Sequence, residues 1–221
     1  MHIGPGFLSP PVWMGAAAVS GAALAGSLAV AGRRLDDRKV PLMGVMGAFV
    51  FAAQMVNFPV LPGTSGHLGG GFLLGILLGA PLAMIVMASI LIVQALVFQD
   101  GGIEALGANI LVMGVMPAVI GEAVRRLWLR PLGVLADVAT FLGGVAAVVL
   151  GATAVILMLW VSDSLPGSVG LWRAIGVMDL VHLVIGVVEG AASVAVARYV
   201  LKVRRDAVFG EPLAQREGAA A

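Results

Sequence analysis

Residues Val40–Gln99 read VPLMGVMGAFVFAAQMVNFPVLPGTSGHLGGGFLLGILLGAPLAMIVMASILIVQALVFQ. This stretch of 60 residues contains no Lys, Arg, Asp or Glu, and His67 is its only side chain that titrates near neutral pH. A helix that crosses a lipid bilayer needs about 20 mostly apolar residues. The stretch is therefore long enough for more than one crossing, and it predicts an all-α integral membrane protein.

The rest of the chain has the same character. Of its 221 residues, 60% are apolar and 11% are charged, and the mean hydropathy is +1.06. A typical soluble domain is about 25% charged, so this composition excludes a soluble enzyme, a disordered protein and a nucleic-acid-binding protein. The sequence has no cysteine, which excludes disulfides, thiolate metal sites and Cys nucleophiles. A metal would have to be held by nitrogen or oxygen, or weakly by Met sulfur.

Six nearly uncharged blocks follow one another along the chain. They cover Ser9–Gly32, Val40–Leu61, Gly69–Gln99, Ala105–Gly121, Pro131–Ser162 and Leu171–Ala197. Basic residues that flank membrane spans remain mostly in the cytoplasm, and six crossings would place basic clusters on both sides. Splitting Gly69–Gln99 at Gly79-Ala80-Pro81 removes this conflict, because proline interrupts a helix. We therefore expect seven transmembrane helices, with the N-terminus outside and the C-terminus in the cytoplasm.

Block length limits what the split can produce. The 31 residues of Gly69–Gln99 make about 46 Å of helix, which is short for two complete spans. At least one short or broken helix is expected, either as two short spans or as one interrupted helix. We expect residues 1–203 to form one membrane domain with an external metal site, and residues 204–221 to form a flexible cytoplasmic tail. Met1–Leu24 contains no Lys or Arg, so no cleaved signal peptide is expected.

The first candidate site combines the start of the chain with a loop histidine. The Met1 amino group, the His2 amide nitrogen and the His2 imidazole can chelate one metal ion through fused five- and six-membered rings, and His67 would add a fourth nitrogen. Four nitrogens in a plane suit Ni(II) or Cu(II), whereas Zn(II) prefers a tetrahedron. The alternative is a chance second residue and an ordinary loop histidine.

An enzymatic alternative starts from Gly63-x-Ser65-Gly66. This pattern resembles the nucleophile motif of rhomboid intramembrane proteases, in which a histidine on a late helix acts as the base. Ser65 and His182 would be the catalytic pair in this protein. Against this interpretation, Ser65 lies in a Gly- and Pro-rich loop, and no oxyanion-hole arrangement is recognisable.

Polar residues within the predicted spans form a third group. Asp179, His182 and Glu189 lie on one face of the last predicted helix, where they either hold helices together or support the metal loop. Gln54 lies one turn before Asn57. Metal-bound imidazoles usually require hydrogen-bonded partners that orient them. The candidates for this orienting role are Asn57, Gln94, Gln99, Asn109, Asp179 and His182. The alternative is that they only form hydrogen bonds between helices.

Several segments together resemble the CbiM/NikM family, the metal-specific capture subunits of energy-coupling-factor transporters. The matching stretches are MHI at the start followed by GFL, NFPVLPGTSGHLGGG at 57–71, IVQALVFQDGGIEALGANILVMGVMP at 92–117 and HLVIGVVEG at 182–190. The resemblance implies six core helices plus an extra N-terminal helix that brings the amino terminus into the site. It also implies that the metal ligands are Met1, His2 and His67.

The same resemblance implies a role in transport rather than catalysis. The protein would capture Ni(II) or Co(II) as transported substrate in the prokaryotic cytoplasmic membrane, with a link to cobalamin biosynthesis. Its partners would be a membrane coupling subunit, two cytoplasmic ATPase subunits and, in some systems, a small accessory membrane subunit. The loop GTSGHLGGG at 63–71 resembles the nickel branch more closely than the cobalt branch.

Overall fold

The computed structural model describes residues 1–35, 37, 39–129, 133–165 and 167–209. Five helical segments in this part of the chain are long and apolar enough to cross a membrane. They are α1 (Pro10–Arg34), α4 (Ala80–Val93) with the π-helix η1 (Gln94–Phe98), α5 (Leu106–Ile110) with the π-helix η2 (Leu111–Val115) and α6 (Met116–Trp128), α7 (Val134–Val161), and α8 (Leu171–Val203). The protein is therefore a multi-pass helical membrane protein.

Shorter elements complete the described structure. They are α2 (Lys39–Gln54), α3 (Gly71–Leu78), α9 (Arg205–Phe209), and the two strands β1 (Phe58–Pro59) and β2 (Ser65–Gly66). The strands pair antiparallel and form a small hairpin before α3. Residues 210–221 of the predicted tail, and the basic residues Arg38 and Arg130, lie outside the described residues.

The predicted break at Gly79 is present in the structure. Gly79 has a φ of 82°, α3 ends at the residue before it, and α4 begins at the residue after it with Pro81 in its first turn. With eight residues, α3 is only about 12 Å long, which is too short to span the hydrocarbon core of a bilayer by itself. Every residue of α3 is buried. Gly75 has no side chain, so the backbone of α3 packs closely against the Ala118 carbonyl of α6. The expected short helix is thus a core helix.

Two side chains of α6 stabilise the break. Glu122 accepts a hydrogen bond from the backbone N–H of Ala80 at 3.1 Å, and Arg125 donates to the carbonyls of Ile76 and Leu77 at 2.9 and 3.2 Å. Interrupted backbone within a membrane protein requires such partners, because lipid offers no hydrogen bonds. The break is therefore a fully bonded structural feature.

Helix α9 corrects the prediction of a flexible tail for residues 204–209. Its residues Ala207 and Val208 are buried. Arg125 donates a hydrogen bond to the Val208 carbonyl at 2.6 Å, and its guanidinium lies 4.5 Å from the centre of the Phe209 ring. Arg125 and the buried apolar side chains thus hold α9 against α6. The polar composition of the tail did not indicate this contact.

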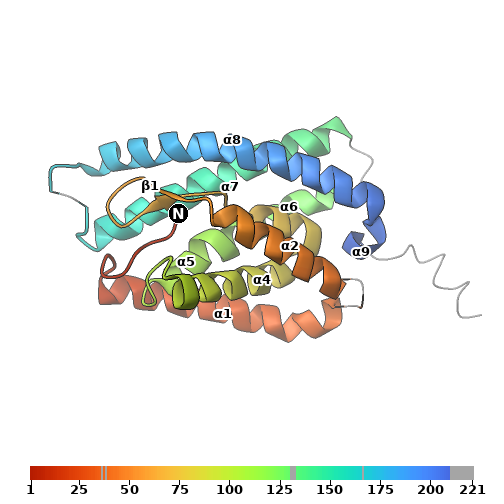
Figure 1. Cartoon of the computed structure of the whole chain (residues 1–221), viewed down its shortest axis with the longest axis horizontal. Helices are drawn as coiled ribbons and strands as arrows, with labels where there is room; N and C mark the ends of the chain where they lie inside the picture. Colours follow the sequence, from red (N-terminus) through yellow and green to blue (C-terminus); the bar gives the residue numbers. More distant parts are fainter. Residues whose placement is uncertain (36, 38, 130–132, 166, 210–221) are drawn as a thin grey trace, which may run out of the picture.

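The two ends of the helical bundle differ in what they carry (Figure 1). The N-terminus, the β-hairpin and the end of α7 lie toward one end, whereas the C-terminal end of α1, the start of α2 and α9 lie at the other. The second end carries the basic residues Arg33, Lys39, Arg125, Arg126 and Lys202. This distribution agrees with the charge pattern used to orient the chain.

Candidate metal centre

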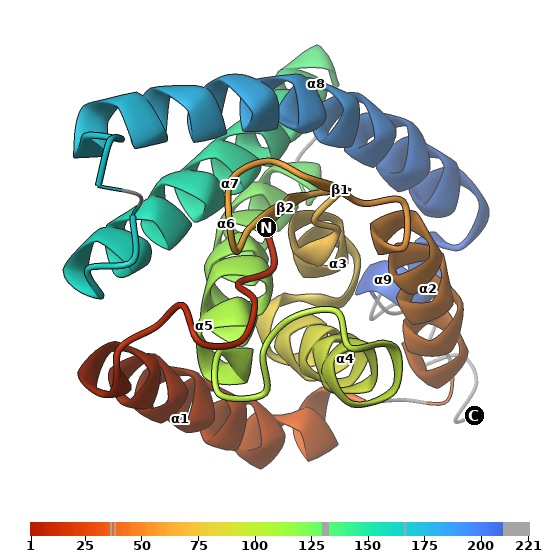
Figure 2. The same cartoon turned by 60° about the vertical axis from the view of Figure 1, so that its left-hand side comes forward.

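The first residues of the chain lie inside the end of the bundle, close to α3 and α5 (Figure 2). Met1, His2 and Ile3 are 1%, 4% and 0% exposed. Ile3 pairs with Thr64 as an isolated antiparallel bridge, and a β-carbon at Gly151 would lie 3.0 Å from the Met1 sulfur. The apolar side chains of residues 1 and 3 therefore fix the backbone that carries His2 between them.

Asn109 of α5 also binds the N-terminal segment, through the backbone of Ile3. Its side-chain oxygen accepts from the Ile3 N–H at 2.8 Å, and its amide nitrogen donates to the Ile3 carbonyl at 3.2 Å. This pairing replaces the ladder partner that an edge strand lacks. Asn109 thus contacts the backbone next to His2 rather than its imidazole.

The imidazoles of His2 and His67 lie against each other. Their ring centres are 4.6 Å apart with an interplanar angle of 34°. His67 Nδ1 lies 2.8 Å from the Leu68 carbonyl, and since a carbonyl only accepts, Nδ1 carries the proton. His67 Nε2 then has a free lone pair, and it is buried without a hydrogen-bond partner among the described residues, as is His2 Nδ1.

Two backbone nitrogens complete the group. The Met1 amino nitrogen lies 3.5 Å from the Ser65 hydroxyl oxygen, and the His2 N–H donates to the same oxygen at 3.3 Å. Within the described part of the chain, no three His, Cys, Asp or Glu side chains converge on one point. A metal centre here therefore depends on the backbone nitrogens as well as the two imidazoles.

Burial disfavours the protonated forms of the Met1 amino group and of the two imidazoles. It lowers the pKa of the Met1 amino group to about 4, while the Asp100 carboxylate acts in the opposite direction. Burial, followed by the positive charge of the amino terminus, lowers the pKa of His2 to about 4 and that of His67 well below its usual range. Metal binding requires deprotonated nitrogen ligands, so this environment favours a metal over protons.

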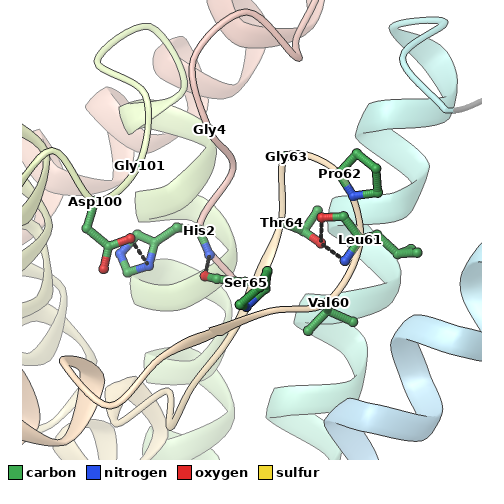
Figure 3. Close-up of a pocket in the computed structure, with 11 residues that line it drawn as sticks. His2, Gly4, Val60, Leu61, Pro62, Gly63, Thr64, Ser65, Asp100 and Gly101 are labelled. Carbon is green, nitrogen blue, oxygen red and sulfur yellow. Dashed lines mark hydrogen bonds and ion pairs between the residues drawn. The ribbon is translucent and has the colours of Figure 1, made fainter.

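A single carboxylate faces the group from the loop after η1 (Figure 3). Asp100 Oδ1 lies 3.4 Å from His2 Nδ1, and its other oxygen accepts from the Asn57 amide at 2.7 Å. A depression of about 560 Å³ is lined by His2, Ser65 and Asp100, and the loop 59–64 forms its wall. Asp100 is the only acidic residue among the described residues that line it, and it provides the negative charge that attracts a cation.

The loop after His67 is held from two sides. Glu189 of α8 accepts from the N–H groups of Gly69 and Gly70 at 2.6 and 2.7 Å, and Gln54 of α2 donates to the Gly69 carbonyl at 2.5 Å. Gly70 adopts a φ of 77°, in which a side chain is strained. Glu189 therefore anchors the loop, which is one of the two roles that its place on the last helix predicted.

The remaining candidates have different positions. Gln94 contacts His2 Nε2 through its side-chain oxygen at 3.1 Å, whereas Gln99 ends η1 in the left-handed conformation with a φ of 55°. Asp179 accepts from Thr153 of α7 at 3.0 Å, so it joins two helices. The Nδ1 atom of His182 lies 2.8 Å from the Met178 carbonyl of its own helix.

The geometry does not support the catalytic pair. The Ser65 hydroxyl lies against the Met1 amino group and the His2 N–H. His182 Nε2, which would have to accept the serine proton, has no hydrogen-bond partner among the described residues. A serine nucleophile needs its base within hydrogen-bond reach.

Comparison with known proteins identifies the family. The family model CbiM, described as "Cobalt uptake substrate-specific transmembrane region", matches residues 2–207. The chain belongs to the CbiM family. This confirms the resemblance inferred from the motifs, and it makes the protein a membrane component of nickel or cobalt transport rather than an enzyme.

Individual relatives agree with this assignment. A protein of Haloquadratum walsbyi named as a metal transport protein is 39% identical over 213 residues, which cover 95% of this chain and 94% of the relative. A fused nickel transport protein of Rhodobacter capsulatus is 35% identical over 163 residues, covering 69% of this chain and 46% of the relative. A crystal structure of a truncated transition metal transporter has a TM-score of 0.82 at 32% identity, covering 91% of this chain and 99% of that one.

Proposed function

We propose that this CbiM-family protein is the metal-capturing subunit of an energy-coupling-factor importer. Its ligands are the Met1 amino nitrogen, the His2 amide nitrogen, His2 Nδ1 and His67 Nε2. The observation that carries the proposal is that two of the three unpartnered buried imidazole nitrogens among the described residues, His2 Nδ1 and His67 Nε2, belong to rings 4.6 Å apart. A buried polar atom without a partner requires an explanation, and a metal ion provides one.

Chelate geometry supports the choice of atoms. The amino nitrogen and the next amide nitrogen close a five-membered ring on a metal, and the amide nitrogen and Nδ1 of the same histidine close a six-membered ring. The unpartnered nitrogen of His2 is Nδ1, as this ring requires. The ring centres of His2 and His67, 4.6 Å apart, bring the fourth nitrogen from the loop.

The donor set favours Ni(II), with Co(II) second. Four nitrogen ligands in one plane suit a d⁸ ion that forms square-planar complexes, and such an ion also promotes loss of the amide proton. The metal is a transported substrate, which has to be released after capture. Asp100 at the mouth of the site draws the hydrated cation toward the ligands.

The orientation and assembly follow from the same proposal. The N-terminus and metal centre face outside, the C-terminus faces the cytoplasm, and the chain crosses the membrane seven times when the short helix α3 is counted as one passage. The partners are a membrane coupling subunit, two cytoplasmic ATPase subunits and a small accessory membrane subunit. ATP hydrolysis then takes place in the partner subunits.

Metal content tests the function directly. Protein carrying a C-terminal tag is purified metal-free, exposed to equal concentrations of Ni(II) and Co(II), and analysed for both elements. We expect one metal ion per chain with Ni(II) in excess. Failure to retain either ion would contradict the proposed function, while an excess of Co(II) would contradict the metal preference alone.

A further inference from the structure

A continuous series of hydrogen bonds joins the loop of His67 to the ring of His2 through the interior of the bundle. The Gly69 carbonyl accepts from Gln54 Nε2 at 2.5 Å, and Gln54 Oε1 accepts from Gln94 Nε2 at 3.0 Å. Gln94 Oε1 then lies 3.1 Å from His2 Nε2. Gln54 and Gln94 are completely buried, so water does not compete for these bonds.

The series has one direction, which its first member dictates. A backbone carbonyl can only accept, so Gln54 has to present its NH₂ group to Gly69 and its oxygen to Gln94. Gln94 must therefore present its own NH₂ group to Gln54 and its oxygen to His2. An oxygen that faces an imidazole nitrogen requires a proton there, so His2 Nε2 carries the N–H and Nδ1 keeps its lone pair.

We propose that Gln54 and Gln94 are positioning residues that select the Nε2–H tautomer of His2 and so present Nδ1 to the metal. The inference rests on the proposed metal-capture function, and it adds what sets the chemistry of the ligand. The Nδ1–H tautomer cannot close the six-membered chelate ring until it loses that proton or transfers it to Nε2. The two glutamines thus remove an unproductive state before the metal arrives.

An opposing acceptor makes this selection necessary. Asp100 Oδ1 lies 3.4 Å from His2 Nδ1 as an ion-pair contact that lacks the geometry of a hydrogen bond, on the other side of the ring from Gln94. A carboxylate is a stronger acceptor than an amide oxygen, so the ring would place its proton on Nδ1, facing Asp100, if Gln94 were not aligned. The carboxylate that attracts the cation therefore competes with the metal for Nδ1, and the two glutamines counter it.

Two adjacent carbonyls of one loop consequently determine which ring nitrogen carries the proton in both metal-binding imidazoles. The Leu68 carbonyl fixes the proton of His67 on Nδ1 directly, and the Gly69 carbonyl fixes that of His2 on Nε2 through Gln54 and Gln94. Glu189 holds the N–H groups of Gly69 and Gly70, which keeps this loop in position. A displacement of the loop would change the protonation pattern of both rings together.

The test reads the tautomer of each histidine in the metal-free, full-length protein. The three histidines are labelled with ¹⁵N, and ring-nitrogen shifts, assigned with His67→Asn and His182→Asn, report which nitrogen carries the proton. In the unsubstituted protein we expect His2 as the Nε2–H form. In Gln94→Leu we expect His2 to move to the Nδ1–H form, with about 10–100-fold weaker Ni(II) binding and His67 unchanged.

Two further variants make the result decisive. Gln94→Glu retains an oxygen facing Nε2 and is expected to keep the Nε2–H form, even if Gln94→Leu folds poorly. Gln99→Asn, which changes the same residue type outside the series at a left-handed position that asparagine tolerates, is the control and should behave like the unsubstituted protein. An Nδ1–H form in the unsubstituted protein, or an unchanged tautomer in folded Gln94→Leu, would overturn the inference. Expected tautomers without any metal binding would instead reject the proposed function.

Discussion

Side chains bind the irregular backbone at both ends of α3, but among the described residues only the N-terminal end also lies beside buried nitrogens without hydrogen-bond partners. At its C-terminal end, the break at Gly79 exposes backbone groups, and Glu122 and Arg125 bind them. At its N-terminal end, Glu189 and Gln54 bind the backbone of the loop just as completely, yet His2 Nδ1 and His67 Nε2 are left without partners. The difference separates anchoring from binding, because the two unpaired nitrogens belong to adjacent rings, where the proposed metal offsets the free-energy cost of leaving them unpaired.

Removal of His67 should have the largest effect on metal binding. His67→Ala deletes one of four ligands and leaves the pocket otherwise intact, so we expect no retained metal under conditions that saturate the unsubstituted protein. Because the lost nitrogen had no partner within the protein, the thermal midpoint of the metal-free protein should stay close to normal. Elemental analysis and thermal unfolding in detergent measure the two quantities. A large loss of stability with retained metal would show that His67 has a structural role and is not a metal ligand.

Arg125→Met is the counterpart at the other end. It removes hydrogen bonds to the carbonyls of Ile76, Leu77 and Val208 and should destabilise the protein by about 1–3 kcal/mol. The metal content of the protein that remains folded should not change, because Arg125 is in the last turn of α6, away from the chain's N-terminus and the metal centre. Denaturant unfolding together with metal analysis checks both. Weakened metal binding in fully folded Arg125→Met would show that the two ends are coupled.

Glu189 sharpens the comparison, since it is a structural anchor close to the metal centre. Glu189→Ala leaves the N–H groups of Gly69 and Gly70 unpaired, so the loop carrying His67 should lose its fixed position. We expect Ni(II) affinity to fall by about 10–100-fold, whereas Glu189→Gln should lose less because it keeps one acceptor oxygen. Titration of the metal-free proteins with Ni(II) measures the affinities. Equal affinities for Glu189→Ala and the unsubstituted protein would show that the anchor does not position His67.

The smallest effect is expected at Ser65. Its hydroxyl contacts the Met1 amino group and the His2 N–H, but these nitrogens exchange that contact for the metal when it binds. Ser65→Ala should therefore weaken metal binding by only about twofold, a fraction of one net hydrogen bond. The same titration measures it. Complete loss would mean that the serine oxygen is itself a ligand.

Local chemistry in the sequence predicted much of this arrangement. Gly79 and Pro81 marked the helix break, and the charge-free stretch around His67 marked the membrane spans and the loop between them. The convergence of His2 and His67 was also predicted, because few nitrogen ligands exist in the chain and both fell on one side of the membrane. The break and the spans depend on residues that are close together in the sequence, so the sequence alone predicts them.

Other features depend on contacts between distant residues and could not be predicted. Glu189 meets Gly69 across 120 positions, and Gln54 meets Gln94 across 40, so the sequence predicted a general supporting role for Glu189 and Gln94 but not the partner of either. The widening of the helix into η1 at Gln94 also had no sequence signal, although such π-helical turns often occur at functional sites. The direction of the hydrogen bonds through Gln54 and Gln94 can be assigned only when the acceptor of the first bond, the Gly69 carbonyl, is known.

The central claim is that the amino terminus itself is a metal ligand. One added residue before Met1 turns the amine into an ordinary amide and removes the five-membered ring, while the His2 and His67 imidazoles remain. The measurement is metal per protein, by elemental analysis, for the extended variant and for a C-terminally tagged control, with folding compared by thermal unfolding. The account predicts a folded extended variant with no retained metal and one metal per chain in the control. Full occupancy of the extended variant would contradict it.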